Sequence, residues 1–194
     1  MSALAHPLAS VEEYFALEDA SPDRHEYYRG RILAMAGGTY DHGAIGANVI
    51  GELRLALKGK ACQVVTSDVR LAASTGTHYT YTDAMVVCGK PVYAGQRRDT
   101  VLNPTVVVEV LSPSTERSDR GRKLTDYQKL ASLREYLLVS QIEPRAESYR
   151  RQPDGTWAYR EWRGLEATVT LESVDAQLRM SEIYEKIEFE PDLD

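Results

Sequence analysis

The sequence contains few cysteines, and they are not arranged as a metal-binding or redox motif. Cys62 and Cys88 lie far apart in apolar, strand-like segments, with no C-x-x-C pair and no neighbouring histidine. Zinc sites and thiol redox centres usually bring such residues together at short spacings, so both kinds of site are poorly supported. We expect both cysteines to be small, buried hydrophobic side chains.

Long hydrophobic runs and a surplus of positive charge are also missing. No window approaches the roughly 20 apolar residues that span a bilayer, and the N-terminal segment MSALAHPLASVEEYFALED has no basic region followed by an apolar stretch. The chain has 23 Lys and Arg against 29 Asp and Glu, a formal net charge of -6. That balance does not favour a protein that coats nucleic acid without specificity, because such binding needs many cations. We expect a soluble protein in the reducing cytoplasm.

The residues that are present alternate between helix-like and strand-like segments without a break in composition. The 194 residues suffice for one core, so we expect a single domain over residues 1–194. Helices are expected at residues 10–20, where Ser10 and Glu13 form a capping box, at 40–57, where apolar residues recur every four positions, at 118–133 and near 181–187. Strands are expected in a hairpin over 25–38 that turns at Arg29 and Gly30, and at 62–73, 81–88, 103–112, 134–140, 145–151 and 157–162, with a polar loop at 89–103. This order predicts a mixed α/β sheet with helices on both faces.

Glu109 is an acid inside the most apolar strand-like run of the chain, VVVEVL. The unbroken valines predict a strand buried on both faces in the centre of a sheet. Because strand side chains alternate, Glu109 shares a face with Val107 and Leu111. A carboxylate taken out of water is costly without compensation, so Glu109 is protonated, paired with a cation or bound to a metal. The purely structural alternative is an ion pair with an arginine from a neighbouring helix.

Asp83 is a second acid that leads into an apolar run, YTDAMVV. Taken alone, it is typical of a strand end or a turn. Two carboxylates at the ends of adjacent strands, with the Val110 carbonyl close by, offer the hard oxygen ligands that Mg²⁺ prefers. The pair therefore predicts a Mg²⁺ or Mn²⁺ site at Asp83 and Glu109.

These motifs resemble a known group of enzymes. With Asp83 at a strand start, Glu109 in VEVLSPST and the segment SDRGRKLTDYQKL after it, the chain is similar to the PD-(D/E)XK nuclease superfamily, and within it to the Uma-type putative restriction endonucleases. The resemblance extends from HEYYRGRI through SDVRL and EYLLVS to the hairpin ESYRRQPDGTWAYREW. It implies a restriction endonuclease-like fold, with a mixed central sheet flanked by helices and a C-terminal β-hairpin. It also implies a metal-dependent endonuclease that hydrolyses DNA phosphodiester bonds.

Two positions depart from the superfamily motif. Thr82 stands where the motif has proline, which matters little because that proline shapes the backbone and binds nothing. Leu111 stands where the motif has its lysine, two residues after the glutamate. The likeness to the Uma-type proteins implies that the following helix supplies the amine, here Lys123. A lysine stem on a packed helix can carry its ammonium back to the pocket; the alternative is a solvated surface lysine.

The same helical segment carries a local excess of positive charge. Residues 113–134 hold six Lys and Arg against three Asp and Glu, in a protein that is acidic as a whole. This excess favours an anionic ligand at the helix, whereas the alternative is an exposed face of mixed charge.

Glu26 is the third acid that the resemblance assigns. In HEYYRGRI it matches the acid that relatives carry before a tight glycine turn, and this likeness implies that it completes or supports the metal site, directly or through water. The alternative is an exposed strand residue. Asp68, His42 and Tyr127 are weaker candidates whose roles the sequence does not decide.

The implied mechanism assigns a role to each residue type. Asp83 and Glu109, with Glu26, would hold Mg²⁺ or Mn²⁺, which acidifies water and neutralises phosphate charge, while Lys123 orients the water or stabilises the transition state. DNA binding is expected to be weak and salt-sensitive unless several subunits pool their basic helices. A small domain without a recognition module favours a homodimer if both strands are cut.

Two other classes of function stay open. The first is a nuclease-fold protein that binds nucleic acid or a protein partner without cleaving it, which Leu111 and the low basic content favour. The second is a structural scaffold, which only the aromatic residues of the C-terminal hairpin support, namely Trp157, Tyr159 and Trp162. Metal dependence separates an enzyme from a scaffold.

Overall fold

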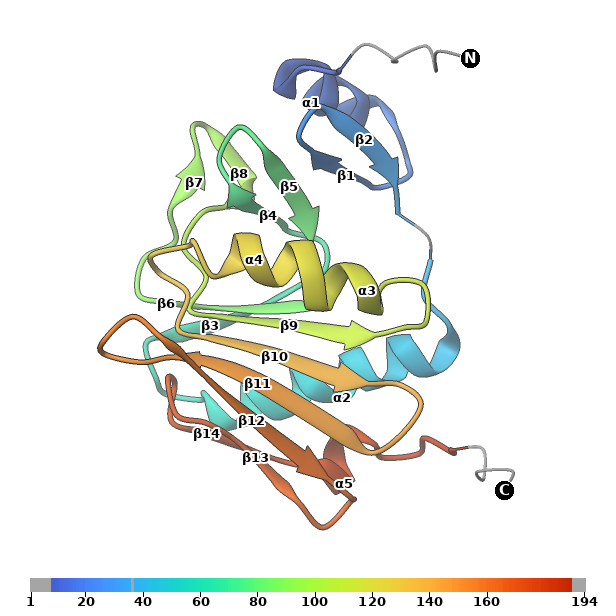
Figure 1. Cartoon of the computed structure of the whole chain (residues 1–194), viewed down its shortest axis with the longest axis vertical. Coiled ribbons are helices and arrows are strands. Elements are labelled where there is room, and N and C mark those ends of the chain that lie inside the picture. The colour runs from blue at the N-terminus through green and yellow to red at the C-terminus, as the bar shows by residue number, and fades with distance from the viewer. Residues whose placement is uncertain (1–7, 36, 190–194) are drawn as a thin grey trace.

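Two six-stranded sheets organise the protein. The computed structural model describes residues 8–35 and 37–189. The first sheet has the strand order β2-β1-β5-β4-β8-β7, the second sheet has the order β12-β11-β10-β9-β6-β3, and β13 and β14 form a separate hairpin (Figure 1). The strands of the first sheet are β1 (His25–Tyr28), β2 (Arg31–Ala34), β4 (Arg70–Ser74), β5 (His78–Tyr81), β7 (Tyr93–Ala94) and β8 (Arg97–Val101). The other strands are β3 (Cys62–Thr66), β6 (Ala84–Cys88), β9 (Val106–Leu111), β10 (Glu135–Ser140), β11 (Arg145–Arg151), β12 (Trp157–Arg163), β13 (Thr168–Leu171) and β14 (Ala176–Arg179).

Helices cover both faces of the second sheet, as the sequence predicts. The helical elements are α1 (Val11–Ala20), α2 (Tyr40–Ala56), α3 (Glu116–Ser118), the π-helical turn η1 (Asp119–Lys123), α4 (Leu124–Tyr127) and α5 (Met180–Ile183). Figure 1 shows α2 on one face of the second sheet and the α3, η1 and α4 segment on the other. None of the described helices is long and apolar enough to cross a membrane. The result is the mixed α/β architecture, with a C-terminal hairpin made by β11 and β12.

Strand β9 lies in the middle of the second sheet and divides its core. It pairs in parallel with β10 and antiparallel with β6, and all six of its residues are buried. Val106, Val108 and Val110 pack in one cluster with the apolar stripe of α2. Val107 and Leu111 pack in a second cluster, under the helical segment that contains Tyr127. The predicted period-two alternation is therefore confirmed, and Glu109, on the face of Val107 and Leu111, points toward the α3 to α4 side.

Local sequence explains the first elements of the chain. Ser10 caps α1 by accepting from the Glu13 amide, and the Glu13 side chain accepts from the Ser10 amide, which confirms the capping box. The β1 to β2 hairpin turns at Arg29 and Gly30, both with positive φ, as the tight turn requires. Thr39 caps α2 through the His42 amide.

Several boundaries differ from the expected ones. The run 62–73 is two strands, because Thr66 and Asp68 form a turn that sends the chain from the second sheet to the first. The run 81–88 is also divided, since β5 belongs to the first sheet and β6 to the second. Asp83 lies at that crossover. The segment 89–103, expected as a loop, contains the short strands β7 and β8, and the β13 to β14 hairpin was not predicted.

The helix expected at residues 118–133 ends early, at Tyr127. The Arg151 guanidinium explains the termination, because it donates to the carbonyl oxygens of Gln128 at 2.6 Å, Leu130 at 2.9 Å and Leu133 at 3.0 Å. Carbonyls past the end of a helix need such partners, and the Leu130 carbonyl also accepts from the Leu133 amide at 3.2 Å.

The prediction for the cysteines is wrong. Cys62 and Cys88 form a disulfide and are half-buried beside the α2 core cluster. They lie directly opposite each other in the antiparallel pairing of β3 with β6. The disulfide could not be predicted from a short motif, because the two cysteines are 26 residues apart in the sequence. Only the pairing register of β3 with β6 brings them together.

Candidate active site

The register of two strands brings Asp83 and Glu109 together. Strand β6 runs antiparallel to β9 with Ala84 opposite Val108, and one further step of this register places Asp83 opposite Glu109. Directly opposed residues share a face of the sheet. The Val110 amide donates to Asp83 Oδ2 at 2.7 Å, so the contact to Val110 is through its N–H rather than the expected carbonyl. The two predicted carboxylates therefore converge where the chain crosses between the sheets.

Glu109 is compensated by two side chains from the helical segment above it. Glu109 is 4% exposed, and its Oε1 accepts from Lys123 Nζ at 3.0 Å and from the Tyr127 hydroxyl at 2.7 Å. The arginine partner considered from the sequence is thus a lysine. Tyr127, a weak candidate by sequence, contacts the central acid directly.

Lys123 also contacts a second acid that the sequence analysis missed. Its Nζ lies 2.9 Å from Asp119 Oδ1, and both residues are buried although they lie on a surface segment. The i, i+4 spacing of an acid and a lysine is the signal that was available, but it normally indicates an exposed helical pair. Here the five residues of η1 form a π-helical turn. Such turns are rare in proteins, and those that occur are often found at functional sites. We call Asp83, Glu109, Asp119 and Lys123 the Glu109 cluster.

The Glu109 cluster has more acids than cations. Burial raises the pKa of Glu109 to about 8, and although the Lys123 ammonium lowers it, the Asp119 and Asp83 carboxylates raise it further. Burial alone would lower the pKa of Lys123, but Glu109 and Asp119 more than reverse this, so Lys123 remains an ammonium. The Glu109 carboxyl therefore takes a proton near neutral pH, because it is buried and shares the Lys123 ammonium with Asp119.

This charge balance fits a divalent cation. Asp83 and Glu109 present hard oxygen donors, and Mg²⁺ usually takes only one or two carboxylates together with water and substrate phosphate. The described residues contain no group of three or more His, Cys, Asp and Glu side chains arranged to hold a metal by themselves. The donor set is therefore that of an incomplete site to which water and substrate would contribute.

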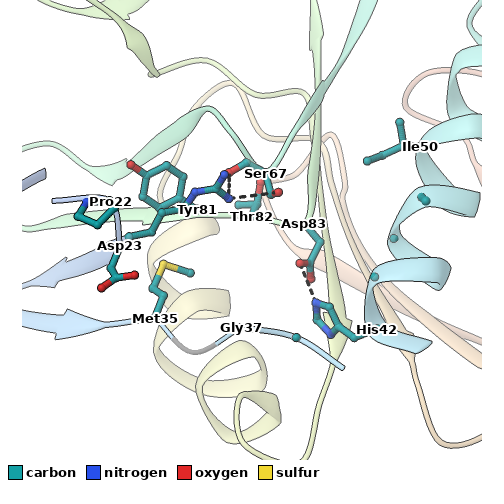
Figure 2. Close-up of a pocket in the computed structure, with 15 residues that line it drawn as sticks. Pro22, Asp23, Met35, Gly37, His42, Ile50, Ser67, Tyr81, Thr82 and Asp83 are labelled. Carbon is teal, nitrogen blue, oxygen red and sulfur yellow. Dashed lines mark hydrogen bonds and ion pairs between the residues drawn. The ribbon is translucent and has the colours of Figure 1, made fainter. Parts of the chain in front are cut away.

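His42 lies at the edge of the cluster, beside a cleft. His42 Nε2 is 3.0 Å from Asp83 Oδ1, and this hydrogen bond raises the pKa of the histidine (Figure 2). The cleft has a volume of about 510 Å³ and runs between α2 and the Arg24 and Met35 side of the first sheet. A substrate bound in this cleft would lie next to Asp83.

Glu26 is placed in a different network. Its Oε2 accepts from Arg122 Nη2 at 2.8 Å and its Oε1 lies 2.9 Å from His78 Nε2. His78 is fully buried, and its Nδ1 lies 2.9 Å from Asp126 Oδ2, while Lys129 Nζ donates to Asp126 Oδ1 at 2.7 Å. Burial raises the pKa of Glu26, but His78 and Arg122 outweigh this and hold it below its usual value. Glu26 therefore pairs with His78 and Arg122, and the Lys123 ammonium, which also lowers its pKa, connects it electrostatically to the Glu109 cluster.

We call Glu26, His78, Arg122, Asp126 and Lys129 the His78 cluster. The sequence did not indicate a site at His78 or Asp126, because neither residue lies in a recognisable motif. Arg122 of the His78 cluster directly precedes Lys123 of the Glu109 cluster, so the two clusters are adjacent in the sequence at this point.

Several of the positive charges of residues 113–134 are paired with acidic side chains of the protein. Arg120 donates to both carboxylate oxygens of Glu147 at 2.6 Å, and Lys123 and Lys129 are paired as described. A basic surface forms instead where Arg122 meets the β1 to β2 hairpin. There Arg29 and Arg122 lie 5.2 and 5.0 Å from the centre of the Tyr28 ring, in a hollow of about 410 Å³ that Arg31 also lines. Asp68 is exposed and pairs with Arg24, outside the Glu109 cluster.

Comparisons with known proteins agree with the fold and show the family. A protein-family model described as "Putative restriction endonuclease" matches residues 11–181. An uncharacterized protein of Synechocystis sp. is 32% identical over 185 residues, 94% of this chain and 95% of the relative, and a second is 29% identical over 162 residues, 84% and 92%. The fold is similar to the crystal structure of a putative nuclease belonging to DUF820 from Anabaena variabilis, with a TM-score of 0.71 and 17% identity over 90% of this chain and 97% of that chain.

Proposed function

On the premise that the chain belongs to the Uma2 family of putative restriction endonucleases, we propose that it is a metal-dependent endonuclease that hydrolyses phosphodiester bonds in DNA. One observation carries the proposal. Asp83 and Glu109 lie opposite each other on adjacent strands, and the Lys123 ammonium is 3.0 Å from Glu109. Two acids and one amine are the functional groups that the superfamily motif requires, and here they meet beside a cleft.

Asp83 and Glu109 would hold Mg²⁺ or Mn²⁺. When bound, the metal supplies Lewis-acid stabilisation of phosphate charge and makes water more acidic. The Val110 amide orients Asp83 by donating to Oδ2, and Tyr127 orients Glu109 by donating to Oε1. Such supporting contacts fix the direction of carboxylate ligands. Glu26 supports the site at a distance, because it holds Arg122 next to Lys123.

Lys123 takes the role of the lysine that the motif places at Leu111. Leu111 is buried in the apolar cluster with Tyr127 and Leu138, so that position has no room for a charge. The Lys123 ammonium reaches the same face of β9 from η1. Held between Glu109 and Asp119, it keeps its proton and stabilises the negative charge that develops on the phosphoryl oxygens.

The basic surface around Tyr28 supports DNA as the substrate. Arg29, Arg31 and Arg122 gather there in a protein of net charge -6. Three phosphate contacts give weak binding that falls steeply with salt. A homodimer would double this surface and present one catalytic site to each strand of a duplex, so we include a dimer in the proposal.

The test is cleavage of supercoiled plasmid and single-stranded DNA at low salt with Mg²⁺ or Mn²⁺. The variants are Asp83→Ala and Lys123→Ala, with Asp19→Ala as the control, since Asp19 is an exposed acid that pairs with Arg97 and does not belong to the Glu109 cluster. We expect the native protein and Asp19→Ala to cut and the two cluster variants to be inactive. Equal cleavage by all four proteins would indicate a contaminating nuclease and reject the site.

Leu111 favours a second candidate function, a nuclease-fold protein that binds DNA without cutting it. The buried leucine removes the usual motif lysine. In that case the native protein binds Mn²⁺ and DNA, and no product forms with either metal. Cleavage that disappears in Lys123→Ala decides against it.

A further inference from the structure

Part of one wall of the cleft beside Asp83 is bare helix backbone, because it is made by glycines. Gly43 and Gly46 of α2 line it, followed on the same helix face by Ala47 and Ile50. A Cβ atom built on Gly43 or Gly46 would meet no atom within 4 Å, so the space in front of these glycines is open. Figure 2 shows His42 and Ile50 on this wall, with Met35, Asp23 and Pro22 across the cleft. A flat group can therefore lie against the helix backbone.

The opposite wall presents a guanidinium in a fixed orientation. Arg24 lies over the Tyr81 ring, 5.2 Å from its centre, and its Nη1 donates to the Ser67 carbonyl at 2.9 Å. Its side chain is 43% exposed and lines the cleft. Guanidinium planes are surfaces on which unpaired bases stack. Met35 adds a thioether to the same wall, which packs well against aromatic rings.

His42 and Thr82, which line the cleft, each have one buried side-chain atom without a hydrogen-bond partner among the described residues, namely His42 Nδ1 and Thr82 Oγ1. Thr82 lines the cleft and is 1% exposed, and its Oγ1 has no hydrogen-bond partner in the part of the chain that the structure describes. Buried hydroxyls are usually satisfied, so such an atom is suited to a ligand that brings a donor or an acceptor.

The charges of the cleft argue for a neutral occupant. Asp23 and Asp83 line it together with Arg24 and His42, so the cleft does not concentrate positive charge as a phosphate site would. The basic surface lies elsewhere, around Tyr28. The volume of about 510 Å³ falls within the range of roughly 300–1,000 Å³ that is typical of small-ligand pockets.

We propose that this cleft receives an unpaired nucleobase adjacent to the phosphate at Asp83, so that the substrate is single-stranded or locally unpaired DNA. The inference rests on the proposed nuclease function. The base lies between the glycine face of α2 and Arg24, and Thr82 Oγ1 hydrogen-bonds to its edge. A base inside a duplex is held in its stack and must be extruded before it can enter.

The test compares two substitutions on one helix. Gly46→Leu fills the cleft, whereas Gly51→Leu is the matched control, because Gly51 is an exposed glycine of α2 that does not line it. Thr82→Val removes the hydroxyl at constant volume. Binding of a fluorescein-labelled oligonucleotide, as a single strand and as its duplex, is measured by anisotropy with Ca²⁺ in place of Mg²⁺, and cleavage is measured with Mg²⁺. Thermal melting and Mn²⁺ binding establish that each variant is folded.

We expect the native protein and Gly51→Leu to bind the single strand about tenfold more tightly than the duplex, the effect of one stacked base. Gly46→Leu loses that preference, and Thr82→Val weakens it. Equal affinity for both DNA forms, with Gly46→Leu identical to Gly51→Leu, overturns the base site while cleavage still upholds the nuclease. Selective single-strand binding that Gly46→Leu abolishes, without any cleavage, upholds the base site and rejects the enzymatic proposal.

Discussion

The two buried charge clusters differ in how completely their carboxylates are paired. In the His78 cluster, each carboxylate oxygen of Glu26 and Asp126 has a cationic or imidazole partner within 2.9 Å, and the pKa values of both acids are lowered. In the Glu109 cluster, Glu109 and Asp119 share one ammonium, Asp83 has only the His42 imidazole beside it among the described side chains, and the pKa of Glu109 is raised to about 8. The first cluster is electrostatically complete, and the second lacks positive charge.

This difference in pairing indicates that the His78 cluster is structural. A completed network holds elements together, and here it joins β1, β5 and the end of the η1 to α4 segment. An incomplete network has a place for a cation from solution and for an anionic substrate. The predictions below test that distinction, from the largest expected effect to the smallest.

Removing the centre of the His78 cluster should cost the most stability. His78→Leu leaves Glu26 Oε1 and Asp126 Oδ2 without that partner in a buried site. Loss of one member of a buried ionic network typically costs about 3–5 kcal/mol. Urea denaturation monitored by circular dichroism measures the change in the free energy of unfolding. A loss under about 1 kcal/mol would contradict the view that this cluster holds β1, β5 and the η1 to α4 segment together.

Removing the ammonium of the Glu109 cluster should separate catalysis from metal binding. Lys123→Met is expected to lower the cleavage rate about 10²–10³-fold, the usual effect of losing one preorganised charge. Mn²⁺ affinity should stay equal or increase, because the ammonium next to Glu109 no longer opposes the metal. Lys129→Met is the control, since Lys129 is half-exposed and pairs only with Asp126. An equal loss of cleavage rate in Lys123→Met and Lys129→Met would contradict a specific role for the ammonium next to Glu109.

The raised pKa of Glu109 predicts a pH dependence of metal binding. Glu109 must lose its proton to bind Mn²⁺, so affinity should fall by about tenfold per pH unit below the pKa of about 8. Titration calorimetry in buffers of different ionisation enthalpy also measures the proton released. An affinity that does not change between about pH 6 and about pH 7, roughly two units and one unit below the pKa of about 8, would contradict a protonated Glu109.

Glu109 should also affect how the free energy of unfolding depends on pH. Its contribution should fall as the pH rises, whereas that of an acid with a lowered pKa rises. The pKa of Glu109 is raised from 4.5 to about 8 in the folded state, so the folded protein binds the additional proton. The contribution is present in full below about 4.5 and is lost as the pH rises toward 8. The difference in unfolding free energy between the native protein and Glu109→Gln isolates this effect, and a difference that grows in favour of the native protein with rising pH would be inconsistent with it.

The smallest effect is expected for the hydroxyl that orients Glu109. Tyr127→Phe removes a hydrogen bond of 2.7 Å to Oε1 and leaves the packing of the ring intact. The expected destabilisation is about 1–3 kcal/mol, toward the lower end because Lys123 still contacts the same oxygen. Thermal melting measures this change, with Tyr136→Phe as the comparison, since that hydroxyl bonds only to the Asp119 carbonyl at 3.2 Å.

Local patterns predicted most of the elements. The valine run placed β9 in the centre of a sheet, and the capping box fixed the start of α1, because each depends on residues close in sequence. The Asp83, Glu109 and Lys123 grouping came from a family resemblance, and the structure brings these side chains near each other. The boundary within residues 81–88 was missed, since nothing in a continuous strand-like run reveals a change of sheet.

Features that depend on register were beyond the sequence. The Cys62 to Cys88 disulfide follows from the pairing of β3 with β6, and the burial of Asp119 follows from the π-helical turn. His78 became part of a network only through the packing of β5 against the η1 to α4 segment. In each case, residues distant in sequence, or side chains turned by an unusual helix, determine the chemistry.

Mn²⁺ binding to the native protein, Glu109→Gln and Glu26→Gln tests the central distinction most directly. Both substitutions remove one buried carboxylate of similar exposure, and electron paramagnetic resonance counts the bound metal. A metal site at Asp83 and Glu109 predicts that the native protein and Glu26→Gln bind Mn²⁺ with equal affinity, and that Glu109→Gln does not bind it. Binding that survives in Glu109→Gln and disappears in Glu26→Gln would contradict the account and place the metal at the His78 cluster.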